Sequence, residues 1–171
     1  LMFGALNLPV AIYDPAQVLA TIQRERVAVF PGPPALFQGL LNHPELDQFD
    51  ISSLRSCVTG AASIPVEMII EMRDRLGFDT IMTAYGMTET SGLAAYTRPG
   101  DSPETIATTS GCAPAGVELR VVDPTGADVE TGTEGELWVR GFQVTPGYLD
   151  APEQTAEAID ADGWLHTGDI A

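Results

Sequence analysis

The eight residues 85–92, Tyr-Gly-Met-Thr-Glu-Thr-Ser-Gly, carry the side chains with the clearest chemical use in this chain. They follow a short β-prone run at residues 80–84, so the pattern predicts a strand that ends in a polar loop. In an open α/β sheet, ligands bind beyond the carboxyl ends of the strands. The loop offers the ring of Tyr85, the hydroxyl of Thr88 and the carboxylate of Glu89, a hard oxygen ligand suited to Mg²⁺. A Gly-containing turn without a ligand is the plain alternative.

Three further segments fit the same chemistry. Thr-Gly-Ala-Ala-Ser occupies residues 59–63, Gly-Glu-Leu-Trp-Val-Arg-Gly residues 135–141, and Asp-Gly-Trp-Leu-His-Thr-Gly-Asp residues 162–169. In this order, and together with residues 85–92, they resemble the motifs of the adenylate-forming superfamily. That superfamily comprises acyl-CoA synthetases, luciferases and the adenylation domains of peptide synthetases. The four motifs extend over most of the chain.

The resemblance implies a reaction in two steps. A carboxylate attacks the α-phosphorus of ATP to give acyl-AMP and pyrophosphate, and the thiol of CoA then attacks the mixed anhydride. It implies ATP and Mg²⁺ as cofactors, CoA as co-substrate, and Thr88 and Glu89 as catalytic residues. Glu89 would hold Mg²⁺ against the phosphates, and Thr88 would donate to the α-phosphate or the acyl carbonyl. A solvated turn carboxylate and a turn hydroxyl that bonds its own backbone are the structural alternatives.

The resemblance also implies a nucleotide site. Its cofactor-binding residues are Gly60, Ala61, Ala62, Tyr85, Gly86, Met87, Thr88 and Asp169. Small side chains at residues 60–62 would let the backbone approach adenine and the acyl group, and Tyr85 would lie against adenine. The carboxylate of Asp169 would accept hydrogen bonds from both ribose hydroxyls. A strand-to-helix turn, a core tyrosine and a turn aspartate are the alternatives.

Residues next to Asp169 are expected to support it. Trp164 and His166 are expected to pack and orient the ribose motif, since His166 has no paired acid in the sequence that would make it a general base.

The acid substrate is less defined. Met87 argues against peptide-synthetase adenylation domains, which usually carry proline at that place. The stretch at residues 141–148 resembles fatty-acid and aryl-acid CoA ligases, and residues 92–95 are small and apolar, so we expect a fatty-acid-type ligase. Aryl or steroid side-chain acids stay open. So do an adenylase that loads a carrier protein and a non-catalytic nucleotide-binding module.

Composition excludes several partners. A formal net charge of −16 argues against nucleic acid and anionic membrane surfaces, because both require basic patches. No apolar run approaches the roughly 20 residues that span a bilayer.

Cys57 and Cys112 lack metal-ligand spacing, and Cys57 is expected to be a buried thiol, so reduced cysteines and an ATP-dependent family favour the cytoplasm. A homo-oligomer stays open.

The basic residues are all arginine. The superfamily uses one lysine in an upstream phosphate loop and another on a mobile carboxy-terminal domain, and neither segment is found in these 171 residues. We therefore expect an internal part of a longer enzyme, inactive by itself.

The elements that position these motifs follow from periodicity. Asp14 and Pro15 predict a helix start, Pro33 and Pro34 another, and residues 27–30, 54–58 and 80–84 predict strands. A further helix is expected from Pro65, capped by Ser63, with Val66, Ile69 and Ile70 inward and Gly77 past its end. If the strands at 54–58 and 80–84 are neighbours, both polar loops converge on one crevice.

Residues after about 111 change character. Residues 117–123 and 136–140 alternate as antiparallel strands do, and residues 152–159 are expected to be helical. The predicted fold class is therefore α/β. A parallel sheet flanked by helices carries the acyl and adenine loops in residues 1–110, and a small β-rich subdomain in residues 111–171 ends in the ribose motif.

Overall fold

The computed structural model describes residues 4–60 and 62–171, which form two compact units. Unit 1 contains the chain up to Met82 together with Pro99–Thr108. Unit 2 contains Thr83–Arg98 and Thr109–Ala171. The polar loop at residues 85–92 therefore belongs to the same unit as Asp169. The domain boundary predicted at residue 110 stays a prediction.

Unit 1 begins with two helices, α1 at Pro15–Glu25 and α2 at Pro34–Leu41. The Asp14 carboxylate accepts a hydrogen bond from the backbone N–H of Gln17 at 2.9 Å, which confirms the predicted helix start. Pro34 occupies the first turn of α2, where a missing N–H costs nothing.

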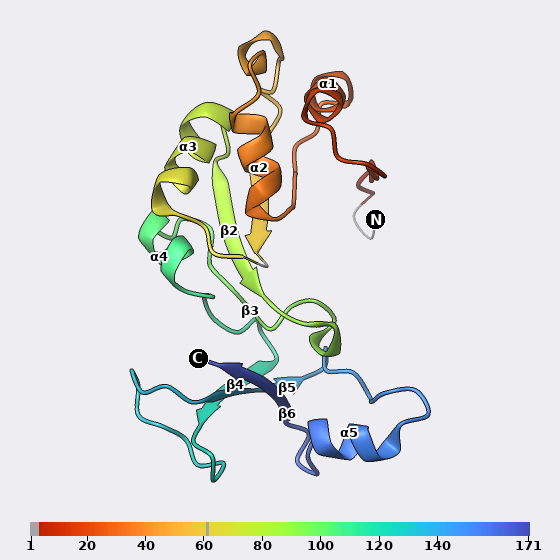
Figure 1. The fold of residues 1–171 in the computed structure, drawn as a ribbon, viewed down its shortest axis with the longest axis vertical. Coiled ribbons are helices and arrows are strands. Elements are labelled where there is room, and N and C mark those ends of the chain that lie inside the picture. Colours follow the sequence, from red (N-terminus) through yellow and green to blue (C-terminus); the bar gives the residue numbers. More distant parts are fainter. Residues whose placement is uncertain (1–3, 61) are drawn as a thin grey trace. The chain divides into compact units, whose positions relative to one another are not determined.

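A strand–helix–strand crossover follows the helices. Strand β1 at Ser56–Gly60 leads through α3 at Val66–Leu76 to β2 at Thr80–Tyr85, and β1 and β2 are neighbours in the sheet order β1-β2-β3. Figure 1 draws the arrows of β1 and β2 in the same direction, with α2 and α3 beside them. Gly77 ends α3 with φ of 76°, a left-handed conformation that glycine adopts without strain. A short 3₁₀ turn at Leu46–Gln48 and helix α4 at Pro103–Thr108 complete unit 1.

The core of unit 1 is aromatic and aliphatic. The Phe37 ring meets the edges of Phe30 and Phe78, with centroids 5.5 and 5.9 Å apart. Cys57 on β1 is fully buried there, as expected, and burial raises the pKa of its thiol to about 12. The fully buried large side chains of this unit are Leu19, Ile22, Phe37, Leu40, Ile69, Met72, Leu76, Phe78 and Ile106.

Three local predictions in unit 1 are wrong. Residues 27–30 form only an isolated parallel bridge, Val29 with Ser56, supported by backbone hydrogen bonds between Ala28, Phe30 and Ser56, and Val29 is 58% exposed. The N-cap of α3 is Pro65, with no side-chain cap, so Ser63 does not cap it. Ile70 is 41% exposed, and Met72 and Leu76 join Ile69 on the buried face instead.

Unit 2 is mainly antiparallel sheet. The strand order is β4-β5-β6. Strand β4 is at Val117–Val122, β5 at Glu136–Gly141 and β6 at Leu165–Ile170. Figure 1 shows helix α5, at Pro152–Ala158, beside these strands. The two-residue strand β3, Ala95–Tyr96, pairs with Ala84 and Tyr85 at the end of β2. Strand β6 was not predicted, because its sequence, Leu-His-Thr-Gly-Asp-Ile, lacks the alternation of apolar and polar residues that indicates a strand.

The helices and strands confirm the predicted α/β class with a β-rich carboxy-terminal part. Within the part of the chain that the structure describes, every helix is too short or too polar to cross a membrane.

Adjacent isoleucines on α3 test the packing of unit 1. Ile69 is fully buried, so Ile69→Ala should lower the free energy of unfolding by about 2–5 kcal/mol through lost apolar contact and a residual cavity. Urea unfolding followed by circular dichroism measures the change.

Ile70→Ala is the matched control. Its side chain is 41% exposed, so the same change should cost less than half as much. Equal losses for the two variants would contradict the orientation of α3.

Candidate functional site

The loop after β2 is tightly folded on itself. Thr90 and Gly92 donate their backbone N–H groups to the carbonyl of Met87 at 3.1 and 3.0 Å, and Ala94 donates to the carbonyl of Tyr85 at 2.8 Å. A Cβ on Gly86 would lie 2.4 Å from the carbonyl oxygen of Gly92, so only glycine permits this approach.

Thr90 is the internal brace of the loop. Its side chain is fully buried, and its hydroxyl accepts from Met87 N–H and donates to the Met87 carbonyl, both at 3.0 Å. Thr88 is exposed, and among the described residues its hydroxyl has no hydrogen-bond partner. The turn hydroxyl that bonds the backbone of the loop is therefore Thr90, and the ligand role of Thr88 stays a prediction.

Folding brings Tyr85 and Asp169 together. The Tyr85 hydroxyl donates to Asp169 Oδ2 at 2.5 Å, although the two residues are 84 positions apart in sequence. Partial burial and this hydrogen bond raise the pKa of Tyr85 to about 12, so the phenol stays protonated and remains a donor at neutral pH. Two residues that were predicted to bind adenine and ribose are thus direct neighbours in unit 2.

Strand β6 leaves regular pairing just before Asp169. Trp138 pairs with His166 but Glu136 pairs with Ile170, so the register shifts and a bulge forms between these pairs. Bulges turn side chains out of the ladder and are common beside active sites. This bulge presents Asp169 as an exposed carboxylate.

Side chains hold the bulge in place. Glu136 Oε1 accepts from Gly168 N–H at 3.0 Å, and the Thr167 hydroxyl donates to the Leu137 carbonyl at 2.7 Å. The Thr167 oxygen also accepts from Asp169 N–H at 3.1 Å. Residues 167 and 168 are therefore fixed to β5, and Thr167 in turn holds the backbone N–H of Asp169.

The segment after β5 bonds both the backbone carbonyl and the side-chain carboxylate of Glu89. Thr145 N–H donates to the backbone carbonyl of Glu89 at 2.7 Å, and the Tyr148 hydroxyl donates to Glu89 Oε1 at 2.8 Å. This second bond raises the pKa of Tyr148. Nearby, the Ser91 hydroxyl donates to the Gln143 carbonyl at 2.9 Å, so the loop and this segment are joined along their length.

The earlier polar loop lies in unit 1. Gly60 ends β1 and is half-buried, Ala62 is exposed, and Ala61 lies outside the described residues. The strands β1 and β2 are neighbours, as expected. The meeting of the two loops in one crevice stays a prediction.

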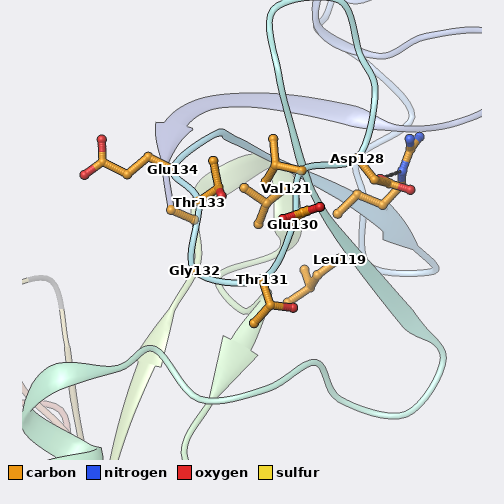
Figure 2. Close-up of a pocket in the computed structure, with 11 residues that line it drawn as sticks. Leu119, Val121, Asp128, Glu130, Thr131, Gly132, Thr133 and Glu134 are labelled. Atoms are coloured by element: carbon orange, nitrogen blue, oxygen red, sulfur yellow. Dashed lines mark hydrogen bonds and ion pairs between the residues drawn. The ribbon is translucent and has the colours of Figure 1, made fainter.

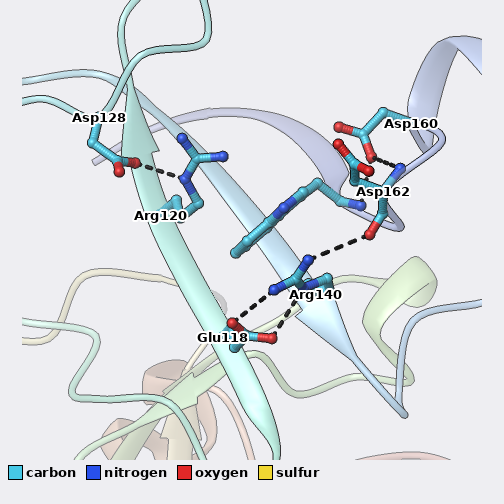
Figure 3. Close-up of polar contacts among 7 residues, drawn as sticks. Glu118, Arg120, Asp128, Arg140, Asp160 and Asp162 are labelled. Carbon is cyan, nitrogen blue, oxygen red and sulfur yellow. Dashed lines mark hydrogen bonds and ion pairs between the residues drawn. The ribbon is translucent and has the colours of Figure 1, made fainter.

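An aromatic and cationic row stiffens the sheet behind the bulge. Trp138 stacks on His166 with centroids 3.9 Å apart, and Trp164 lies under the guanidinium groups of Arg120 and Arg140 at 5.2 and 4.4 Å. Figure 3 shows Arg140 paired with Glu118 and Arg120 with Asp128. Trp164 and His166 therefore pack within the sheet, as predicted, and their part in orienting the motif stays a prediction.

His166 has an acid nearby that the sequence did not reveal. Its Nε2 lies 3.5 Å from Asp160 Oδ2, a carboxylate six positions away that the turn before β6 folds back. The stacked ring faces Trp138 and not Asp169, which agrees with a structural role.

A cavity of about 580 Å³ lies elsewhere in unit 2 (Figure 2). Leu119 and Val121 of β4 and the loop around Glu130 and Glu134 line it. It contains none of the predicted site residues, and the Arg120 guanidinium in its lining is paired with Asp128.

The described residues contain no cluster of three or more His, Cys, Asp or Glu side chains that could hold a metal ion by themselves. Mg²⁺ is usually bound through one or two carboxylates together with substrate phosphates and water. Glu89 suits that mode, since Tyr148 takes only one of its two oxygens.

Comparison with known proteins identifies the family. Residues 2–149 match the family described as AMP-binding enzyme. The chain belongs to the AMP-binding enzyme family. Two relatives, from Mycobacterium tuberculosis and Rhodococcus jostii, are 48% and 46% identical over 99% of this chain. Both are named as CoA ligases for a 7a-methyl-1,5-dioxo-octahydro-1H-inden-4-yl propanoyl group.

A solved structure shows the same fold. The anthranilate CoA ligase AuaEII, in complex with anthranoyl-AMP, has a TM-score of 0.80 and 29% identity over 91% of this chain. The chain spans about 30% of the length of these proteins, since it covers 32%, 31% and 29% of them.

Sequence reasoning missed four residues that support the site: Thr90, Glu136, Tyr148 and Thr167. Thr90 had a local signal, because a threonine three residues after Met87 can bond its backbone. The other three act across strands or between loops, and no spacing in the sequence indicates those contacts.

Thr90→Val tests the brace of the loop. It keeps the shape but leaves the backbone N–H of Met87 without its partner, while the Met87 carbonyl keeps its bonds from Thr90 and Gly92. The free energy of unfolding should therefore fall by about 1–3 kcal/mol. Denaturant unfolding of the chain measures this cost.

Thr88→Val makes the same change on an exposed neighbour. It should alter the free energy of unfolding by no more than about 0.5 kcal/mol. A cost as large as that of Thr90→Val would show that the two threonines are wrongly distinguished.

Proposed function

We propose that this chain carries the adenylate-binding loops of an ATP-dependent acid–thiol ligase that releases AMP. The contact between Tyr85 and Asp169, at 2.5 Å, supports this proposal most directly, because it joins the predicted adenine and ribose residues. The names of the relatives as CoA ligases, and a similar fold around anthranoyl-AMP, support it further.

The residues of unit 2 suggest how the nucleotide would be held. Asp169 has one oxygen engaged by Tyr85, and its remaining lone pairs would accept from the ribose hydroxyls. The Tyr85 ring would lie against adenine. The backbone that follows it is held by the close approach of Gly86 to Gly92 and by the hydrogen bonds of the Met87 carbonyl.

The reacting groups would meet at the end of the loop. The free hydroxyl of Thr88 would donate to the α-phosphate or acyl carbonyl as negative charge develops there. Glu89 would hold Mg²⁺, which when bound neutralises charge on the phosphates. The chain itself supplies position and hydrogen bonds, and a carboxylate substrate and ATP supply the bonds that form and break.

CoA is the acceptor that the names of the relatives indicate. An adenylase that loads a carrier protein would use the same loops, so the acceptor must be tested with both thiols. A non-catalytic nucleotide-binding module is the remaining alternative. It predicts binding of AMP without release of pyrophosphate.

The acid that we propose is a fused-ring propanoic acid. Relatives at 46% and 48% identity are named for such an acyl group, and this class agrees with the steroid side-chain acids left open by the sequence. A straight-chain fatty acid, and thus a role in general lipid metabolism, is the alternative.

We also propose a reducing, cytoplasmic setting. Cys57 and Cys112 are free thiols, and ATP and CoA are the proposed substrates. The negative net charge of −16 disfavours nucleic acid as a partner. Assembly into a homo-oligomer stays open.

Glu89→Gln in the full-length gene product tests the metal role. The neutral amide binds Mg²⁺ weakly, so the rate of acid-dependent pyrophosphate release should fall about 100-fold or more. Mutation of residues that only hydrogen-bond a metal ligand already lowers metal affinity or activity by about 10–100-fold. Binding of AMP without metal should change little.

Glu153→Gln on α5 removes an exposed carboxylate from the same unit and should leave the rate unchanged. A Glu89→Gln enzyme with the rate of the wild type would refute the metal role.

A panel of acids identifies substrate and acceptor. We expect the highest kcat/KM for pyrophosphate release with a fused bicyclic propanoic acid, compared with decanoic and benzoic acids. Thioester should form when CoA is added. Preference for decanoic acid would restore the fatty-acid expectation, and thioester formed only on a carrier protein would favour the adenylase.

A further inference from the structure

The Tyr148 hydroxyl donates a hydrogen bond to the carboxylate of Glu89 at 2.8 Å. It lies outside the four motifs that define the nucleotide site. Its phenol donates to Oε1, so one carboxylate oxygen is fixed in space and the other is left for a cation. A carboxylate that binds a metal is commonly oriented by such a partner.

The backbone of Tyr148 is itself fixed. Thr155 on α5 accepts from Tyr148 N–H at 2.9 Å and donates to the Ala151 carbonyl at 2.9 Å. A Cβ on Gly147 would lie 2.6 Å from the Thr155 methyl group, so glycine allows the segment to pass this closely. The first turns of α5 therefore determine where the phenol points.

The same segment also holds the main chain of Glu89. Thr145 N–H donates to its carbonyl at 2.7 Å, three residues before Tyr148. Backbone and carboxylate of Glu89 are thus bonded to residues 145–148, so the side chain cannot turn away without breaking the phenol contact.

We propose that Tyr148 is a positioning residue for the cation site of Glu89. It acts through the carboxylate and does not touch the reacting atoms. The inference rests on the proposed function, because it takes Glu89 as the ligand of the Mg²⁺ that accompanies ATP. It adds α5 and the segment after β5 to the parts of the fold that set the affinity for the cation.

Tyr148→Phe in the full-length gene product tests the proposal, with calorimetric titration of ATP at a series of Mg²⁺ concentrations. Loss of the hydroxyl should raise the Mg²⁺ concentration for half-maximal ATP binding about tenfold or more. Binding of AMP in EDTA should stay within about twofold of the wild type, because Asp169 and Tyr85 are untouched. An unchanged Mg²⁺ requirement would overturn the proposal.

Tyr96→Phe is the matched control. Tyr96 lies on β3 of the same unit and is half-buried, so the change removes an equivalent hydroxyl away from Glu89. It should leave the Mg²⁺ requirement unchanged. The proposal would be overturned if the Mg²⁺ requirement rose equally in both variants. It would also be overturned if Tyr148→Phe weakened AMP binding in EDTA as much as it raised the Mg²⁺ requirement, because both results would indicate a merely structural effect.

A double-mutant cycle separates this inference from the proposed function. In the Glu89→Gln background, Tyr148→Phe should have no further effect on the Mg²⁺ requirement, since the group that it orients has gone. If Glu89→Gln alone leaves that requirement unchanged, the proposed metal role fails and the inference fails with it. If Glu89→Gln raises it and Tyr148→Phe does not, only the inference fails.

Discussion

The hydrogen bond between Tyr85 and Asp169 is the constraint on which the candidate site depends. It joins the end of β2 to the bulge of β6 across 84 positions of sequence. A phenol that is partly buried and bonded to a carboxylate stays protonated, so the contact persists over the physiological pH range. It places the predicted adenine and ribose residues side by side in unit 2.

Other parts of unit 2 keep this contact in register. Glu136 and Thr167 hold the bulge that carries Asp169, and the stacked pair Trp138 and His166 anchors the strands behind it. On the other side, the buried hydroxyl of Thr90 closes the loop. Rigid supports of this kind are what a site needs if it stabilises charge by position and not by covalent chemistry.

Local rules were readable in the sequence wherever a few neighbouring residues decide the outcome. Asp14 caps α1 and Gly77 ends α3 as predicted, because capping involves groups within one turn of the helix. The orientation of Ile70 was not readable. Its spacing fits the apolar stripe, but the width of the buried face depends on which elements pack against α3.

The sequence by itself determined the family and the α/β class and supplied the residues of the candidate site, since these follow from short motifs and local periodicity. Only the tertiary structure decided which side chains support them. Tyr148 meets Glu89 across 59 positions and Gly168 meets Glu136 across 32, and a hydrogen bond between distant residues depends on strand register and loop path. Neither register nor path is encoded in any single segment, because both result from how the whole unit packs.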